Sequence, residues 1–249
     1  MKQVIRRKFA YFLLLVVLFF FWERAIGQDN IGDPGDYGGY NNSFQLWPSV
    51  KISKDFKYGL SASAQYLLRA DVTGQRVAGN FFYVGVKYKQ FRYLHLDFKF
   101  RGVNSPERNL YRFEFGIKPR YRYKNWTFAF RTAYFNEREY FARVYEHGRY
   151  PTNYWRNRIE VRWDFKKYWG AYVSSEVYTL FDYRGMNTRR VAFIAGIDYT
   201  FLKMHNVDVY YMAQPDFNKK SPNLIQAISF VYTWDIPKSF KKKKKKKNK

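Results

Sequence analysis

The twelve residues from Tyr154 to Phe165 read YWRNRIEVRWDF and alternate between two chemistries. Successive side chains of a β-strand point to opposite faces, so this alternation predicts a strand with one apolar face and one ionic face. The apolar set, interrupted by Asn157, contains Trp155, Ile159, Val161, Trp163 and Phe165. The ionic set contains Tyr154, Arg156, Arg158, Glu160, Arg162 and Asp164.

The same two-residue rhythm recurs along most of the chain, and no helical periodicity competes with it. For example, Leu94, Leu96, Phe98 and Phe100 alternate with His95, Asp97, Lys99 and Arg101. We predict eleven strands, near residues 43–53, 58–70, 80–90, 92–102, 109–122, 125–136, 153–165, 169–181, 188–201, 206–213 and 223–235, with ends uncertain by about 2 to 4 residues.

These repeated strands indicate an all-β fold, a single antiparallel transmembrane β-barrel with lipid outside and charges inside. Aromatic residues make up 22% of the chain, yet the mean hydropathy is −0.57. A helical membrane protein would not combine these values, whereas a barrel does because each strand is only half apolar. A Lys or Arg facing lipid at the bilayer midplane costs roughly 2 to 4 kcal/mol, so the ionic face must point inward.

The chain is expected to have four parts. Residues 1–27 are predicted to be a cleaved signal peptide, because basic residues precede an apolar run from Phe9 to Trp22 and the small-x-small site Ala25-Ile26-Gly27. The alternative is an uncleaved anchor, although the run is short for a bilayer core that takes roughly 20 residues. Residues 28–42 are expected to be irregular, 43–236 to form the barrel, and 237–249 to be a disordered lysine-rich tail.

The number of strands is expected to be even. Short connections are typical of the periplasmic side and long ones of the outside, and both termini are predicted to be periplasmic. Eleven strands therefore require a correction to twelve, with ten as the alternative. Aromatic residues near strand ends are candidates for the interfacial girdles that amphipathic rings prefer: Trp47, Tyr123, Trp126, Tyr154, Trp169 and Trp234.

Charged residues on the inward face are the candidate functional residues. Rings of Arg and Lys favour anions, so an anion passage or binding site is one interpretation. The other is a salt-bridge plug, because eight-stranded barrels are filled by side chains and wide channels open near sixteen strands. The predicted lumen-lining residues are Asp97, Lys99, Arg101, Arg112, Glu114, Lys118, Arg120, Arg156, Arg158, Glu160, Arg162, Asp164 and Glu176.

Other chemistry has weak support in the sequence. The spacing of His95 and Asp97 is compatible with metal ligation, but no further ligands complete a shell, so no metal or other cofactor is expected. The serines at 61, 63, 174 and 175 lack a Gly-x-Ser-x-Gly context, and no cysteine is present as a nucleophile or for a disulfide. A non-enzymatic protein is therefore expected, with a lipid-modifying enzyme as an alternative.

The basic charge has two sources that lie outside the barrel. Of the formal +25, the tail lysines carry nine units and the signal a net four, which leaves +12 on the rest of the chain. The tail is interpreted as solvated, with attraction to anionic headgroups as the alternative. Export disfavours nucleic-acid binding despite the pI of about 10.0. The expected partners are outer-membrane lipids including lipopolysaccharide, the barrel insertion machinery and anionic solutes.

Several short motifs resemble a family of outer-membrane barrels of unassigned function that is common in Bacteroidota. The motifs are Leu46-Trp47, the run from Tyr66 to Arg69, the run from Asn153 to Arg158, and the run from Arg190 to Tyr199. The resemblance implies an outer-membrane barrel and supplies no catalytic residues. The chain departs from the family where a lysine run follows Phe240 in place of a terminal aromatic residue. The expected roles are a small pore, a transport component or a structural surface protein. An exported soluble ligand-binding barrel is a further alternative.

Overall fold

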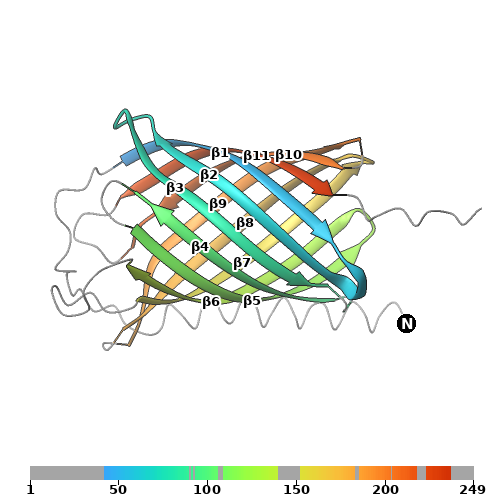
Figure 1. The fold of residues 1–249 in the computed structure, drawn as a ribbon, viewed down its shortest axis with the longest axis horizontal. Helices are drawn as coiled ribbons and strands as arrows, with labels where there is room; N and C mark the ends of the chain where they lie inside the picture. The colour runs from blue at the N-terminus through green and yellow to red at the C-terminus, as the bar shows by residue number, and fades with distance from the viewer. Residues whose placement is uncertain are drawn as a thin grey trace, which may run out of the picture.

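The computed structural model describes residues 42–89, 91, 93–105, 109–139, 152–182, 185–202, 204–217 and 223–236. These residues form a closed barrel of eleven strands (Figure 1). The strands are β1 Asn42–Asp55, β2 Leu60–Asp71, β3 Arg76–Tyr88, β4 Leu94–Asn104, β5 Asn109–Tyr123, β6 Trp126–Glu139, β7 Thr152–Lys166, β8 Trp169–Asp182, β9 Gly185–Phe201, β10 His205–Pro215 and β11 Leu224–Ile236. A single 3₁₀ turn, Lys57–Gly59, joins β1 to β2. No helix within the described ranges is both long and apolar enough to cross a membrane.

The predicted all-β barrel is confirmed, and each of the eleven predicted strands is present with its ends moved by at most four residues. The correction to twelve or ten strands was wrong. Ten neighbouring pairs are antiparallel, and β1 closes the ring by pairing with β11 in parallel. An odd number of alternating strands leaves the first and the last pointing the same way, so this closure can only be parallel. The arrows of β1 and β11 accordingly end on the same side in Figure 1.

The parallel seam is long and continuous. It runs without a register shift from Asn42↔Leu224 to Lys54↔Ile236, and the hydroxyl of Ser229 donates a hydrogen bond of 3.0 Å to the backbone oxygen of Trp47. The start of β1 and the end of β11 therefore lie at opposite ends of the barrel. The predicted periplasmic location of both termini concerns residues 1–41 and 237–249, which lie outside the described residues, as do the signal peptide and the tail.

The connections divide the barrel into two ends. The turn end holds the last residues of β1, β3, β5, β7 and β9 and the described residues 56–59, 89, 91, 93, 124–125, 167–168, 202 and 204. The loop end holds the last residues of β2, β4, β6, β8 and β10 and the described residues 72–75, 105, 216–217 and 223. The links after β2 and β8 are shorter than predicted, because β3 begins at Arg76 and β9 at Gly185.

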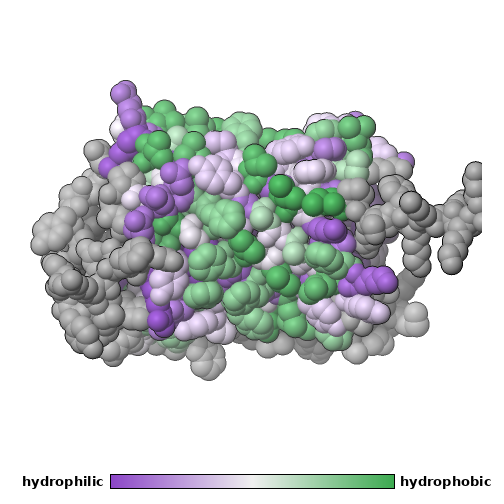
Figure 2. Space-filling model, viewed as in Figure 1, coloured by the Kyte–Doolittle hydropathy of each residue, from purple (hydrophilic) through white to green (hydrophobic). Residues whose placement is uncertain are grey.

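The outer surface of the barrel is apolar along every strand. Each of the eleven strands contributes at least one large apolar side chain that is exposed, among them Phe98, Phe115, Val173 and Phe193 at 48 to 57%. The bulged residue Arg189 apart, the charged residues on the outward parity of the described strands are Lys54, Arg138 and Lys166, each within two residues of a strand end. On the face in view in Figure 2, hydrophobic and pale side chains cover the middle, and hydrophilic ones lie mostly towards the two ends.

Two of the six predicted girdle residues were assigned to the wrong side. Trp47 is only 5% exposed and packs inside the barrel with Leu67, Phe81 and Met212. Tyr154 shares the inward parity of Arg156 and stacks on the buried ring of Phe135 at 4.9 Å. The other four lie outside and are exposed, namely Tyr123, Trp126, Trp169 and Trp234.

Candidate functional site

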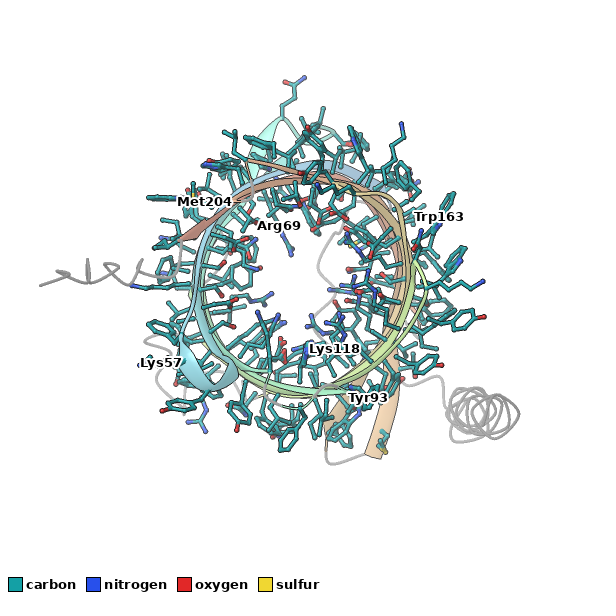
Figure 3. All side chains as sticks on the ribbon, turned by 90° about the vertical axis from the view of Figure 1, so that its right-hand side faces the viewer. Lys57, Arg69, Tyr93, Lys118, Trp163 and Met204 are labelled. Atoms are coloured by element: carbon teal, nitrogen blue, oxygen red, sulfur yellow. The ribbon has the colours of Figure 1, made fainter. Side chains whose placement is uncertain are left out.

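The inward side chains surround a cavity of about 500 Å³ inside the barrel. Figure 3 views the barrel along its axis from the turn end, with Arg69 and Lys118 on the interior side and Trp163 on the exterior. Strands β1 to β5 and β7 to β10 supply the lining residues. Nine of these residues are Lys or Arg and five are Asp or Glu, so the cavity lining has a formal excess of four positive charges.

Arg131 is the centre of a buried ion-pair network on the wall formed by β4 to β8. Its guanidinium donates to both carboxylate oxygens of Asp97, with distances of 2.9 Å from Nη2 and 3.0 Å from Nε to Oδ2, and it also contacts Glu114. The three side chains are 7 to 8% exposed. Glu114 further accepts from Arg156 at 3.0 Å and lies 3.7 Å from Lys99. Four strands are thus joined through two carboxylates.

Gly116 provides the space that this network needs. A Cβ atom at this position would lie 2.3 Å from Oδ1 of Asp97 and 2.7 Å from Nη2 of Arg131. Gly116 is the register partner of both Asp97 on β4 and Ala133 on β6. Because Gly116 has no side chain, the guanidinium of Arg131 on β6 can reach across β5 to Asp97 on β4.

The network continues toward both ends of the barrel. At the loop end, Glu137 pairs with Arg101 and Arg112, and the Arg112 guanidinium lies 3.9 Å from the centroid of the Phe135 ring. Toward the turn end the pairs are Lys118–Glu160 at 3.1 Å, Arg158–Glu160 at 2.9 Å, Arg158–Glu176 at 3.1 Å, Arg162–Asp164 at 2.7 Å and Arg162–Asp198 at 2.5 Å. Most arginines that were predicted to favour anions are therefore neutralised by carboxylates.

An apolar and aromatic patch covers the opposite part of the interior at the loop half. The side chains of Trp47, Leu67, Phe81 and Met212 pack together there. The guanidinium of Arg69 lies between two rings, 4.0 Å from the centroid of Trp47 and 4.2 Å from that of Phe81. Cation–π contact with two rings holds this cation in place without a carboxylate.

Comparisons with known proteins identify no relative by sequence. No protein-family model matches the chain, and no curated protein matches it. Among solved structures, it is similar to a protein described as "Bacterial polysaccharide outer membrane secretin". The TM-score is 0.47 and the identity 10%, and the match covers 68% of this chain and 62% of that chain.

The structure brings most of the predicted lumen residues together. Ten of the thirteen line the cavity: Asp97, Lys99, Arg101, Arg112, Glu114, Arg156, Arg158, Glu160, Arg162 and Glu176. Of the other three, Lys118 pairs with Glu160, and Asp164 pairs with Arg162 and Arg122. Arg120 shares the inward parity of Lys118 in β5.

Sequence reasoning missed several interior residues that shape the site. Arg131 lies on the inward parity of β6, opposite the apolar residues Trp126, Phe128 and Phe130, so its parity could have revealed it. Lys51, Arg69 and Lys87 were also missed, because their strands carry few charges and show a weaker alternation. The cavity-lining residues absent from the predicted set further include Asp208, Tyr172 and Tyr210.

The other candidate residues are scattered. The carboxylate of Asp97 accepts hydrogen bonds from Arg131, and no cluster of three potential metal ligands occurs within the described residues. Ser61 and Ser174 are buried, and the inward Ser63 lies among the cavity-lining residues, whereas Ser175 lies on the outward parity with Val173. His205, which lies just before the predicted strand 206–213, begins β10 and stacks between Phe201 and Tyr232 on the exterior.

Proposed function

We propose that this chain is an outer-membrane β-barrel whose lumen is a narrow passage that favours anions. The observation that carries the proposal is the separation of its two surfaces. All eleven strands expose large apolar side chains outward, whereas the ion pairs are inside. This is the arrangement that a bilayer selects, since outward-facing charges at membrane depth are costly.

A soluble ligand-binding barrel is the alternative that this surface disfavours. Monomeric soluble proteins rarely expose contiguous apolar patches larger than a few hundred Å². Here the exposed apolar side chains continue around the ring, including Val50 at 51%, Phe82 at 50% and Ile197 at 50%. Lipid acyl chains would cover this surface, with the aromatic rings of Trp126, Trp163 and Trp169 near the turn end at the lipid interface.

The anion preference follows from the charges that line the cavity. The cavity lining has four more cations than carboxylates. The cavity volume of about 500 Å³ distinguishes this barrel from one whose interior is filled by side chains. Fixed positive charge in a pore favours anions. By the usual pattern of short periplasmic turns, the turn end would face the periplasm.

Two measurements test the proposal on the purified full chain. Heat-dependent gel mobility of the membrane fraction is expected for a barrel inserted in the membrane. In planar bilayers under a KCl gradient, the reversal potential is expected to indicate chloride over potassium. A protein found only in soluble fractions, or a cation-selective conductance, would contradict it.

The role proposed is non-enzymatic. Lipid turnover by the purified barrel in lipopolysaccharide-containing vesicles is expected to be at background level, and equal in His95→Ala. Turnover that the His95→Ala substitution abolishes would favour the lipid-modifying alternative.

A further inference from the structure

The wall formed by β1, β2 and β3 carries inward cations that no carboxylate neutralises. Residues 42–88 contain two carboxylates, Asp55 and Asp71, and both lie at strand ends, where they pair with Lys89 and Arg76. The inward cations of this wall are Lys51, Arg69 and Lys87, and all three line the cavity. Within the described residues, none of them has a carboxylate oxygen within 4.0 Å.

Lys51 and Lys87 differ from Arg69 in having no aromatic partner. Arg69 is held between Trp47 and Phe81, whereas neither ammonium group lies over a ring in the described part of the chain. The largest electrostatic effects on Lys87 come from four like charges, those of Lys51, Lys99, Lys118 and Lys89. Like charges gathered at one wall repel each other unless an anion lies between them.

The carboxylates around these two lysines accept hydrogen bonds from other groups. Asp97 is the register partner of Lys87, but both of its oxygens accept from Arg131. The carboxylates with the largest electrostatic effect on Lys51 are Asp235 and Asp208. Asp235 accepts from the hydroxyl of Ser53, and Asp208 accepts from Tyr172 at 3.0 Å. The interior itself therefore supplies no direct counter-ion for either lysine.

Gly85 leaves a narrow recess in the wall beside these lysines. It lies two residues before Lys87, and the recess is closely bordered by Cγ of Lys99 and the Ser63 hydroxyl, which lie 3.3 Å and 3.5 Å from the position that a Cβ atom would take. The residues on both sides, Val84 and Val86, have outward side chains, yet they border the cavity together with Gly85. The missing side chain thus exposes the strand backbone to the cavity, with the Ser63 hydroxyl on the adjacent strand.

We propose that Lys51 and Lys87, with the recess at Gly85, form a binding site for an oxyanion, the phosphate or carboxylate group of a small solute. The inference rests on the proposed function, because it names the place where the passage holds its anion. Lysine binds phosphate as a compact point charge with three donors. Two such charges favour a divalent phosphate over a monovalent anion of similar size.

Equilibrium dialysis of the full-length barrel in detergent micelles against radiolabelled inorganic phosphate tests the site. Wild type is expected to bind phosphate saturably, with chloride and acetate as weaker competitors. The double substitution Lys51→Gln/Lys87→Gln is expected to weaken binding at least tenfold. The matched control, Lys54→Gln/Lys57→Gln, makes the same charge change on exposed residues outside the lumen and is expected to leave binding unchanged.

Two more variants separate a local site from general lumen charge. Gly85→Phe keeps every charge but fills the recess, and it is expected to weaken phosphate binding at least tenfold. Lys118→Gln removes a lumen cation that Glu160 already neutralises, and binding is expected to change less than twofold. Heat-dependent gel mobility verifies that each variant is folded.

The results of these experiments distinguish the proposed oxyanion site from the proposed anion-selective passage. Saturable phosphate binding that depends on Lys51, Lys87 and Gly85, in a barrel without conductance, would support the site and contradict the passage. Absence of saturable binding by wild type would overturn the site whatever the conductance. Equal losses in Lys118→Gln or in the exterior control would also overturn it, because diffuse positive charge would then account for the binding.

Discussion

Two walls of the same barrel differ in whether carboxylates neutralise their inward cations. On β4 to β8, carboxylates on neighbouring strands face arginines and lysines, and Asp97, Glu114, Glu137, Glu160 and Glu176 each contact at least one cation. On β1 to β3, cations face the cavity without carboxylates, and apolar rings replace ion pairs at the loop half. One wall is thus cross-linked by ion pairs, whereas the other keeps unpaired cations, the feature on which the proposed oxyanion site depends.

The seam of the barrel belongs to the second wall. Parallel pairing is slightly less stable per residue than antiparallel pairing. The β1–β11 seam compensates with thirteen paired positions in unbroken register. It also packs Trp47 and Ala227 into the interior apolar cluster, so burial of apolar surface supports the closure.

Substitution of Arg131 by Met is the most severe way to break the paired wall. It would leave Asp97 and Glu114 buried beside each other without their shared cation, and breaking a buried ion pair costs about 3 to 5 kcal/mol. Urea unfolding in micelles measures the loss. Arg122→Met is the control, because its side chain is 60% exposed and such pairs contribute about 0 to 1 kcal/mol. Equal losses in the two variants would contradict the structural role of the network.

Both walls turn their apolar parity outward and their charged parity inward. Phe115→Lys tests this on the outward parity, where a midplane lysine costs about 2 to 4 kcal/mol in a bilayer. Ser63→Lys is the inward counterpart on β2 and is expected to cost less than half as much. Unfolding in lipid vesicles measures both. A neutral Phe115→Lys would mean that lipid does not cover this surface.

Removal of the stacked cation tests the apolar half of the β1–β3 wall. Arg69→Met is expected to cost about 0.5 to 2 kcal/mol, the range of a cation–π contact from exposed to desolvated. Arg69→Lys keeps the charge but loses the planar stack, so its unfolding free energy should lie between those of wild type and Arg69→Met. An Arg69→Lys variant as stable as wild type would assign the stabilisation to charge alone.

A carboxylate introduced into the β1–β3 wall is expected to neutralise part of its positive charge, as carboxylates do on the β4–β8 wall. Gln65 is the register partner of Lys51, so Gln65→Glu places a negative charge beside it. An ion pair at about 4 Å in water is worth about 1 kcal/mol, which corresponds to roughly fivefold weaker phosphate binding and a smaller anion preference. Gln65→Met, which adds no charge, is expected to leave the reversal potential unchanged. An unaltered reversal potential in Gln65→Glu would place the selectivity elsewhere.

Much of the fold was predictable because strand alternation is local. The apolar parity of residues 155–165 and of 94–100 identified the outward face correctly without any knowledge of neighbours. The girdle assignments of Trp47 and Tyr154 failed because residue type alone does not specify parity. Arg131 was overlooked for a related reason, since its importance comes from Asp97 and Glu114, which lie 34 and 17 residues away in the chain.

The sequence by itself determined that this chain has two chemically distinct surfaces, since alternate side chains of a strand must point to opposite faces. Only the tertiary structure decided how the ring closes and which interior cations remain without carboxylates. Strand register and the parallel seam bring together residues that are distant in the chain. The pairing of Arg131 and the unpaired state of Lys51 and Lys87 are therefore properties of the closed barrel rather than of any single strand.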